Sequence, residues 1–169
     1  MNQKQPIVPF HEFDLSRPVA ARADIEAVIP HRFELSLNDG ILYEDNDSGR
    51  CVGYCRVPTD AFWVRGHFPE LTIMPGVLVC ECAAQLTSYF ALKYRQLQSN
   101  LIALGALEDV KFRGPVFPGK TLVVMIERIR NRPMLIKVRF QAYVDETLTT
   151  EGTLIGIVLP PNLNEGESR

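Results

Sequence analysis

A histidine and a glutamate fourteen residues apart are the pair in this chain best suited to acid–base chemistry. His67 lies between Gly66 and Phe68-Pro69, in a segment whose glycine and proline indicate an irregular loop, and such loops often display functional groups. Glu81 follows in a run of apolar residues, where burial would disfavour ionisation, raise its pKa and let it donate a proton near neutral pH. We therefore interpret His67 and Glu81 as a candidate base and a candidate acid.

Two neighbouring residues could assist this pair. Gly76 follows Pro75 at an expected helix start, where its unpaired N–H lies at the positive end of the helix dipole and can hold an oxygen that gains negative charge. Gln85 lies four residues after Glu81, the spacing at which one helical side chain can orient another. Removal of water from a 3-hydroxyacyl thioester needs a base, an acid and such a donor. From the residues alone, an incidental loop histidine and a solvated glutamate remain the alternatives.

A long helix must carry the glutamate. From Gly76 to about Tyr94 there is no further glycine or proline, and apolar residues occur on nearly every face, which predicts a central helix wrapped by other elements. Period-two alternation and turn-rich breaks predict strands at 33–44 (bent near 38–40), 50–57, 101–113, 120–130, 134–145 and 151–159, with a short helix over 24–28.

Turn-length connections between these strands imply antiparallel hairpins, and a sheet must bury its apolar face on something. We therefore predict an α+β fold in which an antiparallel curved sheet wraps around one long central helix. The expected division of the chain is an extended N-terminal arm over 1–22, a single domain over 23–160 and a flexible tail over 161–169.

Composition and charge give no sign of a nucleic-acid-binding or membrane-spanning protein. The 169 residues are 46% apolar and 22% charged with a net charge of −2, which is ordinary globular composition and no sign of nucleic-acid binding. No run approaches the roughly 20 apolar residues of a membrane span, and the N-terminus lacks the apolar core of a signal peptide, so the cytoplasm is expected. The region from Lys93 to Arg139 is locally basic and could attract an acidic partner.

Cysteine spacing gives no sign of a metal site or a disulfide framework. Cys51 and Cys55 would lie on one face of a strand about 13 Å apart, and Cys80 and Cys82 would point to nearly opposite sides of a helix. We expect all four to be reduced and partly buried thiols, and we expect no metal.

Three segments resemble the bacterial 3-hydroxyacyl-[acyl-carrier-protein] dehydratases. They are Ile29-Pro30-His31-Arg32, the run GHFPELTIMPGVLVCECAAQ at 66–85, and VKFRGPVFPG at 110–119, in the same order as in that family. The resemblance implies the hotdog fold, a cofactor-independent dehydratase that forms trans-2-enoyl thioesters in fatty-acid or related acyl-chain synthesis, and a homodimer that can assemble into a trimer of dimers.

The resemblance also implies residue roles. His67 matches the catalytic histidine, Glu81 the catalytic acid supplied by the partner subunit, and Gly76 the glycine that binds the thioester carbonyl. The substrate would arrive on the phosphopantetheine arm of an acyl carrier protein, with Lys111 and Arg113 as candidate contacts for that acidic partner. His31 is interpreted as structural, although loops at this place in the family approach the active site.

Departures from the family pattern keep two alternatives open. Glu70-Leu71-Thr72 stands where the family has Gly-x-Pro, Lys120 stands where it has Asp, and the N-terminal arm is longer than usual. A non-catalytic hotdog module that binds acyl chains or a carrier protein is one alternative, favoured by the altered loop. The other is an acyl-CoA thioesterase, which would use a carboxylate and a water and would not need the histidine.

Overall fold

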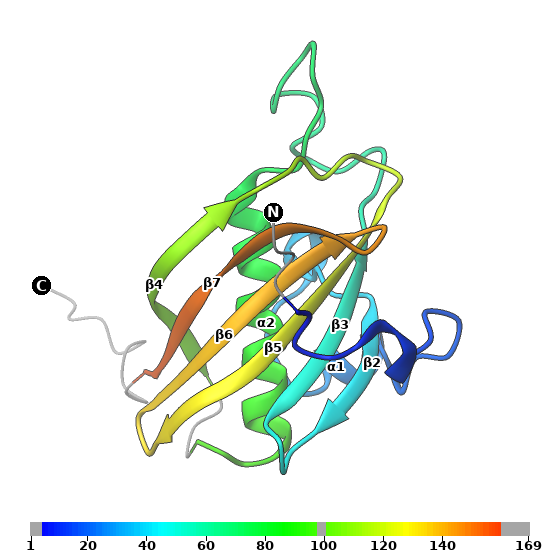
Figure 1. The fold of residues 1–169 in the computed structure, drawn as a ribbon. Helices are drawn as coiled ribbons and strands as arrows, with labels where there is room; N and C mark the ends of the chain where they lie inside the picture. Colours follow the sequence, from blue (N-terminus) through cyan, green and yellow to red (C-terminus); the bar gives the residue numbers. More distant parts are fainter. Residues whose placement is uncertain (1–4, 98–100, 160–169) are drawn as a thin grey trace, which may run out of the picture.

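The computed structural model describes residues 5–97 and 101–159 and contains one seven-stranded antiparallel sheet that curves around a long helix (Figure 1). The strand order across the sheet is β1-β2-β3-β5-β6-β7-β4. The strands are β1 Ala20–Ala21, β2 Gly40–Asp45, β3 Arg50–Arg56, β4 Ile102–Phe112, β5 Thr121–Arg132, β6 Leu135–Val144 and β7 Thr147–Val158. The helices are α1 Arg22–Glu26 and α2 Gly76–Lys93, with 3-10 turns at Phe10–Glu12 and Phe33–Leu35. The predicted α+β fold with a wrapped central helix is confirmed.

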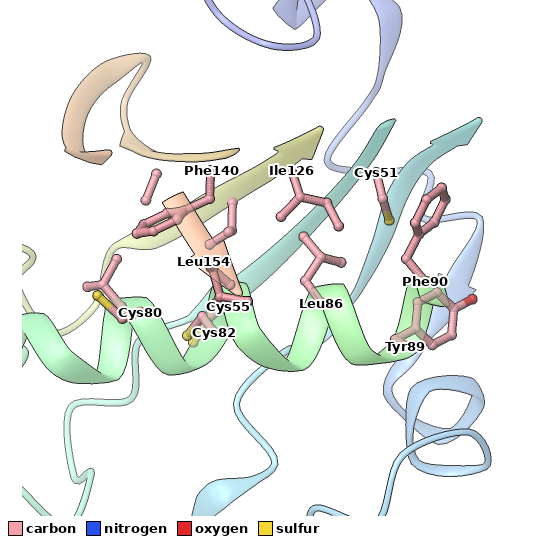
Figure 2. Packing of buried hydrophobic residues seen from close by; sticks show 14 of the residues in the cluster. Cys51, Cys55, Cys80, Cys82, Leu86, Tyr89, Phe90, Ile126, Phe140 and Leu154 are labelled. Atoms are coloured by element: carbon pink, nitrogen blue, oxygen red, sulfur yellow. The ribbon is translucent and has the colours of Figure 1, made fainter. Parts of the chain in front are cut away.

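Helix α2 forms the centre of the core. Pro75 precedes its first residue, where a missing N–H costs nothing, and Lys93 lies in its last turn, where a cation suits the dipole. In Figure 2 its side chains point toward the concave face of the sheet, where Leu86 and Phe90, both fully buried, meet residues of several strands. The sheet side of this contact includes Cys51, Ile126, Phe140 and Leu154.

One stripe of α2 is not covered by the sheet. Val77 is 68% exposed, and Leu78, Glu81 and Ala84 are only partly buried. These positions recur every three or four residues and therefore lie on one face of the helix. Within a single chain the helix is thus wrapped on all sides but one, and the candidate acid lies on the uncovered side.

The strands after α2 follow the predicted alternation. In β6 the residues Ile136, Val138, Phe140 and Ala142 are buried on the helix side. The connections between β5 and β6 and between β6 and β7 are tight, and both pairs are antiparallel, as predicted.

The predicted strand at 33–44 is wrong in its first half. Residues Phe33–Leu35 form a 3-10 turn, and the strand begins only at Gly40. The reason is that residues 37 and 38 bond to α2, Leu37 through its backbone N–H and Asn38 through its side-chain amide. The N–H of Leu37 donates to Oε1 of Gln85 at 3.1 Å, and Asn38 donates its amide N–H to the carbonyl of Cys82 at 3.0 Å.

The described part of the N-terminal arm crosses the face of the sheet opposite α2 (Figure 1). Ile7 and Val8 are 3% and 1% exposed and pack with Val52, Met125 and Tyr143. The Ile7 N–H donates to Oε1 of Gln141 at 2.8 Å, so the side of β6 that carries Gln141 is covered rather than solvated. The predicted tail at 161–169 lies outside the described residues.

All four cysteines are free and buried. Burial raises the pKa of the Cys80 thiol to about 11. None of the helices within 5–97 and 101–159 is long and apolar enough to cross a membrane.

Candidate active site

The loop between β3 and α2 holds His67 by its backbone and by its ring. The His67 N–H donates to the Trp63 carbonyl at 2.9 Å, and the His67 carbonyl accepts from the Ile73 N–H at 3.1 Å. In the ring, Nδ1 lies 2.9 Å from the carbonyl oxygen of Ile73. Because a carbonyl oxygen can only accept, Nδ1 carries the proton and Nε2 keeps a free lone pair. The ring also stacks on Phe68 with centroids 4.2 Å apart.

The histidine and the start of α2 border the same open hollow, which has a volume of about 590 Å³. The lining is largely apolar and includes Met74, Val77 and Phe112, with Gly76 at the helix start. The Gly76 N–H has no acceptor within the helix, because the residue four positions earlier lies outside it. A base and an unpaired backbone donor therefore face one apolar hollow.

The Phe112 ring lies so close to Gly76 that there is no room for a side chain at this position. A Cβ built on Gly76 would lie 2.6 Å from a ring carbon of Phe112, closer than such atoms approach. Any larger residue would displace the ring that borders the hollow.

Glu81 lies on the uncovered stripe of α2 with its side chain 28% exposed. Its Oε1 accepts a hydrogen bond from Nε2 of Gln85 at 2.8 Å, and Nε2 of His31 lies 3.4 Å from the same oxygen. Burial raises the pKa of this carboxyl, but the contacts with His31 and Gln85 outweigh it, so the pKa lies below its ordinary value. The expectation of a raised pKa is wrong, because it counted the burial of Glu81 but not the contacts with His31 and Gln85.

Gln85 is 1% exposed and uses its whole amide group. Besides Glu81, its Nε2 donates to the Leu35 carbonyl at 2.7 Å, and its Oε1 accepts from the Leu37 N–H at 3.1 Å. A side chain tied to the backbone at both ends of its amide cannot swing away. The contact between Gln85 and Glu81 anticipated from their spacing is therefore present.

His67 and Glu81 do not meet within one chain. Glu81 borders a second hollow of about 120 Å³, together with His31, Ser88, Leu104 and Leu154, and His67 is not among its lining residues. The larger hollow contains His67 but not Glu81. The same helix thus presents Gly76 to one hollow and Glu81 to the other.

Of the two candidate contacts for the acyl carrier protein, Arg113 borders a hollow and Lys111 does not. Arg113 borders the larger hollow and forms an ion pair with Glu151, which is 5% exposed. Lys111 is exposed on β4 and borders neither hollow. Four of the other eight basic residues from 93 to 139 form ion pairs with carboxylates, in the pairs Lys93–Glu44, Lys120–Asp145, Lys137–Glu108 and Arg139–Glu127.

The histidine of the Ile29-to-Arg32 segment lies against the candidate acid, a contact that the sequence did not predict. His31 was interpreted as structural, yet its ring contacts the carboxyl of Glu81. The signal available in the sequence was the resemblance of this segment to a dehydratase motif.

Comparison with solved structures supports the fold. A dehydratase heterocomplex, ApeI:P, from Xenorhabdus doucetiae aligns with a TM-score of 0.71 at 14% identity, over 86% of this chain and 95% of that one. Thioesterase superfamily member 2 from Mus musculus aligns with a TM-score of 0.60 at 9% identity, over 82% and 94%. At these identities the likeness concerns the hotdog architecture alone.

Sequence comparison identifies the family. Residues 29–153 match the model of the FabA-like domain. The 3-hydroxyacyl-[acyl-carrier-protein] dehydratase FabZ of Clostridium kluyveri is 33% identical over 135 residues, which are 80% of this chain and 93% of the relative. The enzyme of the same name from Geotalea uraniireducens is 36% identical over 133 residues, 78% and 91% of the two chains. The chain therefore belongs to the FabA-like family of 3-hydroxyacyl-[acyl-carrier-protein] dehydratases.

Proposed function

We propose that this protein removes water from 3-hydroxyacyl thioesters carried by an acyl carrier protein and forms trans-2-enoyl thioesters in fatty-acid or related acyl-chain synthesis. The observation that carries the proposal is the placement of His67 and the Gly76 N–H on one apolar hollow. Membership in the dehydratase family supports the same reaction.

Each group has a role in the elimination. Nε2 of His67 takes the proton from C2, and the electrons of that C–H bond move toward the carbonyl as the Gly76 N–H binds its oxygen. The C2=C3 double bond then forms while the C3–O bond breaks. The Glu81 carboxyl, which must first take up a proton because its pKa lies below the ordinary 4.5, gives that proton to the departing hydroxyl. Water leaves, and the proton on His67 returns through solvent to Glu81.

We further propose that a second copy of the chain supplies the acid. Within one chain Glu81 and His67 border separate hollows, and the stripe of α2 that bears Glu81 is open. Next to it lies the edge strand β4, whose Leu104 is 45% exposed and borders the same hollow as Glu81. Apolar surface of this kind is what a permanent partner covers. A homodimer, alone or within a trimer of dimers, would cover this surface and bring the Glu81 of one chain to the His67 of the other.

The acyl carrier protein is the proposed macromolecular partner, with the cytoplasm as the place of reaction. Arg113 borders the hollow that the phosphopantetheine arm would enter. Lys111 lies on β4, directly before Phe112, which borders the same hollow. An acidic carrier would meet Arg113 at the mouth of the site and Lys111 on the exposed surface of β4.

The test is an assay of wild type, His67→Ala and Glu81→Gln on 3-hydroxyacyl-carrier-protein substrates of several chain lengths, followed by absorbance of the conjugated enoyl thioester. We expect turnover in the wild type and a loss of about 10²- to 10⁴-fold in each variant. Release of free thiol in place of the enoyl product would identify a thioesterase. Tight binding of the carrier without any product would identify the non-catalytic module.

A further inference from the structure

The contact between His31 and Glu81 is not used by the reaction proposed above. Nε2 of His31 lies 3.4 Å from Oε1 of Glu81, and Nε2 of Gln85 lies 2.8 Å from the same oxygen. No other residue in the described part of the chain donates to this carboxyl, so Oε2 has no protein donor. We propose that His31 is a positioning residue that, with Gln85, occupies Oε1 and reserves Oε2 for proton transfer to the departing hydroxyl. The inference rests on the proposed dehydration.

The segment that bears His31 is held in place by the next residue. Nη1 of Arg32 donates to the carbonyls of Ile29 and His31 at 2.8 and 2.7 Å, and Nη2 donates to the carbonyl of Glu26 at 2.9 Å. The guanidinium thereby joins the end of α1 to the turn that follows it, and fixes the backbone that carries the His31 imidazole. A ring that is 26% exposed but anchored in this way can hold one orientation toward α2.

The surroundings of the ring select its tautomer. Nδ1 of His31 is buried and has no hydrogen-bond partner within residues 5–97 and 101–159. A proton there would be a buried donor without an acceptor, which is costly. The proton of the neutral ring therefore lies on Nε2, where it points at Oε1 of Glu81. His31 acts as a hydrogen-bond donor to the carboxyl and leaves the acid role to Glu81.

Two donors on one carboxyl oxygen have two chemical consequences. A carboxylic acid whose Oε1 accepts a hydrogen bond from Gln85 at 2.8 Å and faces Nε2 of His31 at 3.4 Å carries its own proton on Oε2. The same donors stabilise the carboxylate that remains once the proton has left, which makes Glu81 a stronger acid.

Few titratable groups of the same chain line the hollow around the Glu81 carboxyl. The hollow is also lined from β4 by Ile102, Ala103 and Leu104, and from β7 by Leu154 and Gly156, none of which titrates. On α2 the lining residues Ala84, Thr87 and Ser88 are neutral, and the pKa of the neighbouring Cys82 thiol is raised, so it stays uncharged. His31 is thus the one titratable group of the same chain that faces Glu81 among the lining residues of the hollow, and the proposed dimer adds the partner subunit's His67.

The experiment compares His31→Ala, His31→Gln and the control His11→Gln with wild type. His11 lies on the exposed 3-10 turn of the N-terminal arm, away from both hollows. We expect His31→Ala to lower kcat about tenfold with little change in KM, as loss of a hydrogen bond to a charged group predicts. We expect His31→Gln, which keeps an N–H donor, to recover most of kcat, and His11→Gln to match wild type.

A second readout does not depend on turnover. The Glu81 carboxyl is titrated by NMR in protein with isotope-labelled glutamate, and its resonance is assigned with Glu81→Gln. We expect its pKa to rise in His31→Ala, because desolvation remains while a donor is lost, and to return toward the wild-type value in His31→Gln. An unchanged Glu81 pKa in a folded His31→Ala protein overturns the proposal, as does a His31→Gln variant as impaired as His31→Ala. If wild type has no dehydratase activity, the proposed function fails, and the titration still decides the positioning role.

Discussion

At the scale of single residues, backbone carbonyls and amides determine which atom of each functional side chain is available for chemistry. The Ile73 carbonyl accepts a hydrogen bond from Nδ1–H of His67 and leaves Nε2 as the base. The Leu35 carbonyl and the Leu37 N–H hold Gln85, which in turn holds one oxygen of Glu81. Sequence can name these side chains, but the free atom of each depends on partners elsewhere in the chain.

Gly76→Ala tests the close approach at the helix start. The new Cβ would lie 2.6 Å from the Phe112 ring, so the ring or the first turn of α2 must move, and the thioester oxygen loses its aligned donor. We expect kcat/KM for dehydration to fall by about 10- to 100-fold, less than the roughly 10²- to 10³-fold for complete loss of an oxyanion donor, because the backbone N–H is displaced and not removed. The double variant Gly76→Ala, Phe112→Ala, which removes the clash, should be more active than Gly76→Ala alone. A double variant no better than the single one would contradict this explanation.

The lowered pKa of Glu81 predicts how its effect on stability depends on pH. A carboxyl whose pKa is lower in the folded than in the unfolded chain stabilises the fold above its ordinary pKa of 4.5, and that stabilisation is lost as the pH falls through the folded value. The free energy of unfolding of wild type relative to Glu81→Gln should therefore decrease from neutral pH to about pH 3. Urea unfolding at fixed protein concentration measures the difference. A difference that is constant over this range would show that Glu81 is not stabilised as a carboxylate.

At the scale of elements, the two faces of the sheet are covered in different ways. Helix α2 fills the concave face, and the N-terminal arm covers part of the opposite face through Ile7 and Val8. Phe10 and Phe13 of the arm pack on the same cluster, and Gln141 binds the backbone of the arm through the Ile7 N–H at 2.8 Å and the Gln5 carbonyl at 3.2 Å. Its contribution is therefore to stability and not to the site at the other face.

Ile7→Ala tests the contribution of the arm. Truncation of a side chain that is 3% exposed should lower the free energy of unfolding by about 2 kcal/mol. Val19→Ala, at a position on the same arm that is 59% exposed, is the matched control and should change it by less than about 0.5 kcal/mol. Both variants should dehydrate substrate at the wild-type rate. Equal stability of the two variants would show that the arm does not pack on the sheet in solution.

At the scale of the whole molecule, the site proposed above requires two chains. His67 and Glu81 border separate hollows of one chain, and the open stripe of α2 with the edge strand β4 offers the surface on which a copy can pack. In a two-fold symmetric pair each chain would lend its Glu81 to the other. The unit of activity is then the dimer.

Complementation of two inactive variants tests this arrangement. His67→Ala and Glu81→Gln are each inactive as homodimers, but a mixed dimer contains one site with both groups intact. After unfolding and refolding of an equal mixture, random pairing should restore about a quarter of wild-type activity, because half of the dimers are mixed and each has one working site. Refolded single variants are the controls. Failure of the mixture to regain activity, with mixed dimers demonstrated, would place the acid and the base in one chain.

Local sequence signals determined the element types and their order. Proline followed by an uninterrupted apolar run specified α2, and period-two alternation specified β6, because both patterns reflect the geometry of neighbouring residues along the chain. The same local reading named His67, Glu81, Gly76 and Gln85, since catalytic groups here lie close together in sequence.

Only the tertiary structure determined the hydrogen-bond and charge partners of those residues. Glu81 meets His31 fifty residues earlier in the chain, and that contact reverses the expected direction of its pKa shift. The first half of the predicted strand at 33–44 bonds to α2 instead, and Gln141 receives the N-terminal arm. Each of these outcomes depends on the electrostatic or hydrogen-bonding partner that folding brings across the chain, and such partners leave no periodic pattern in the sequence from which to predict them.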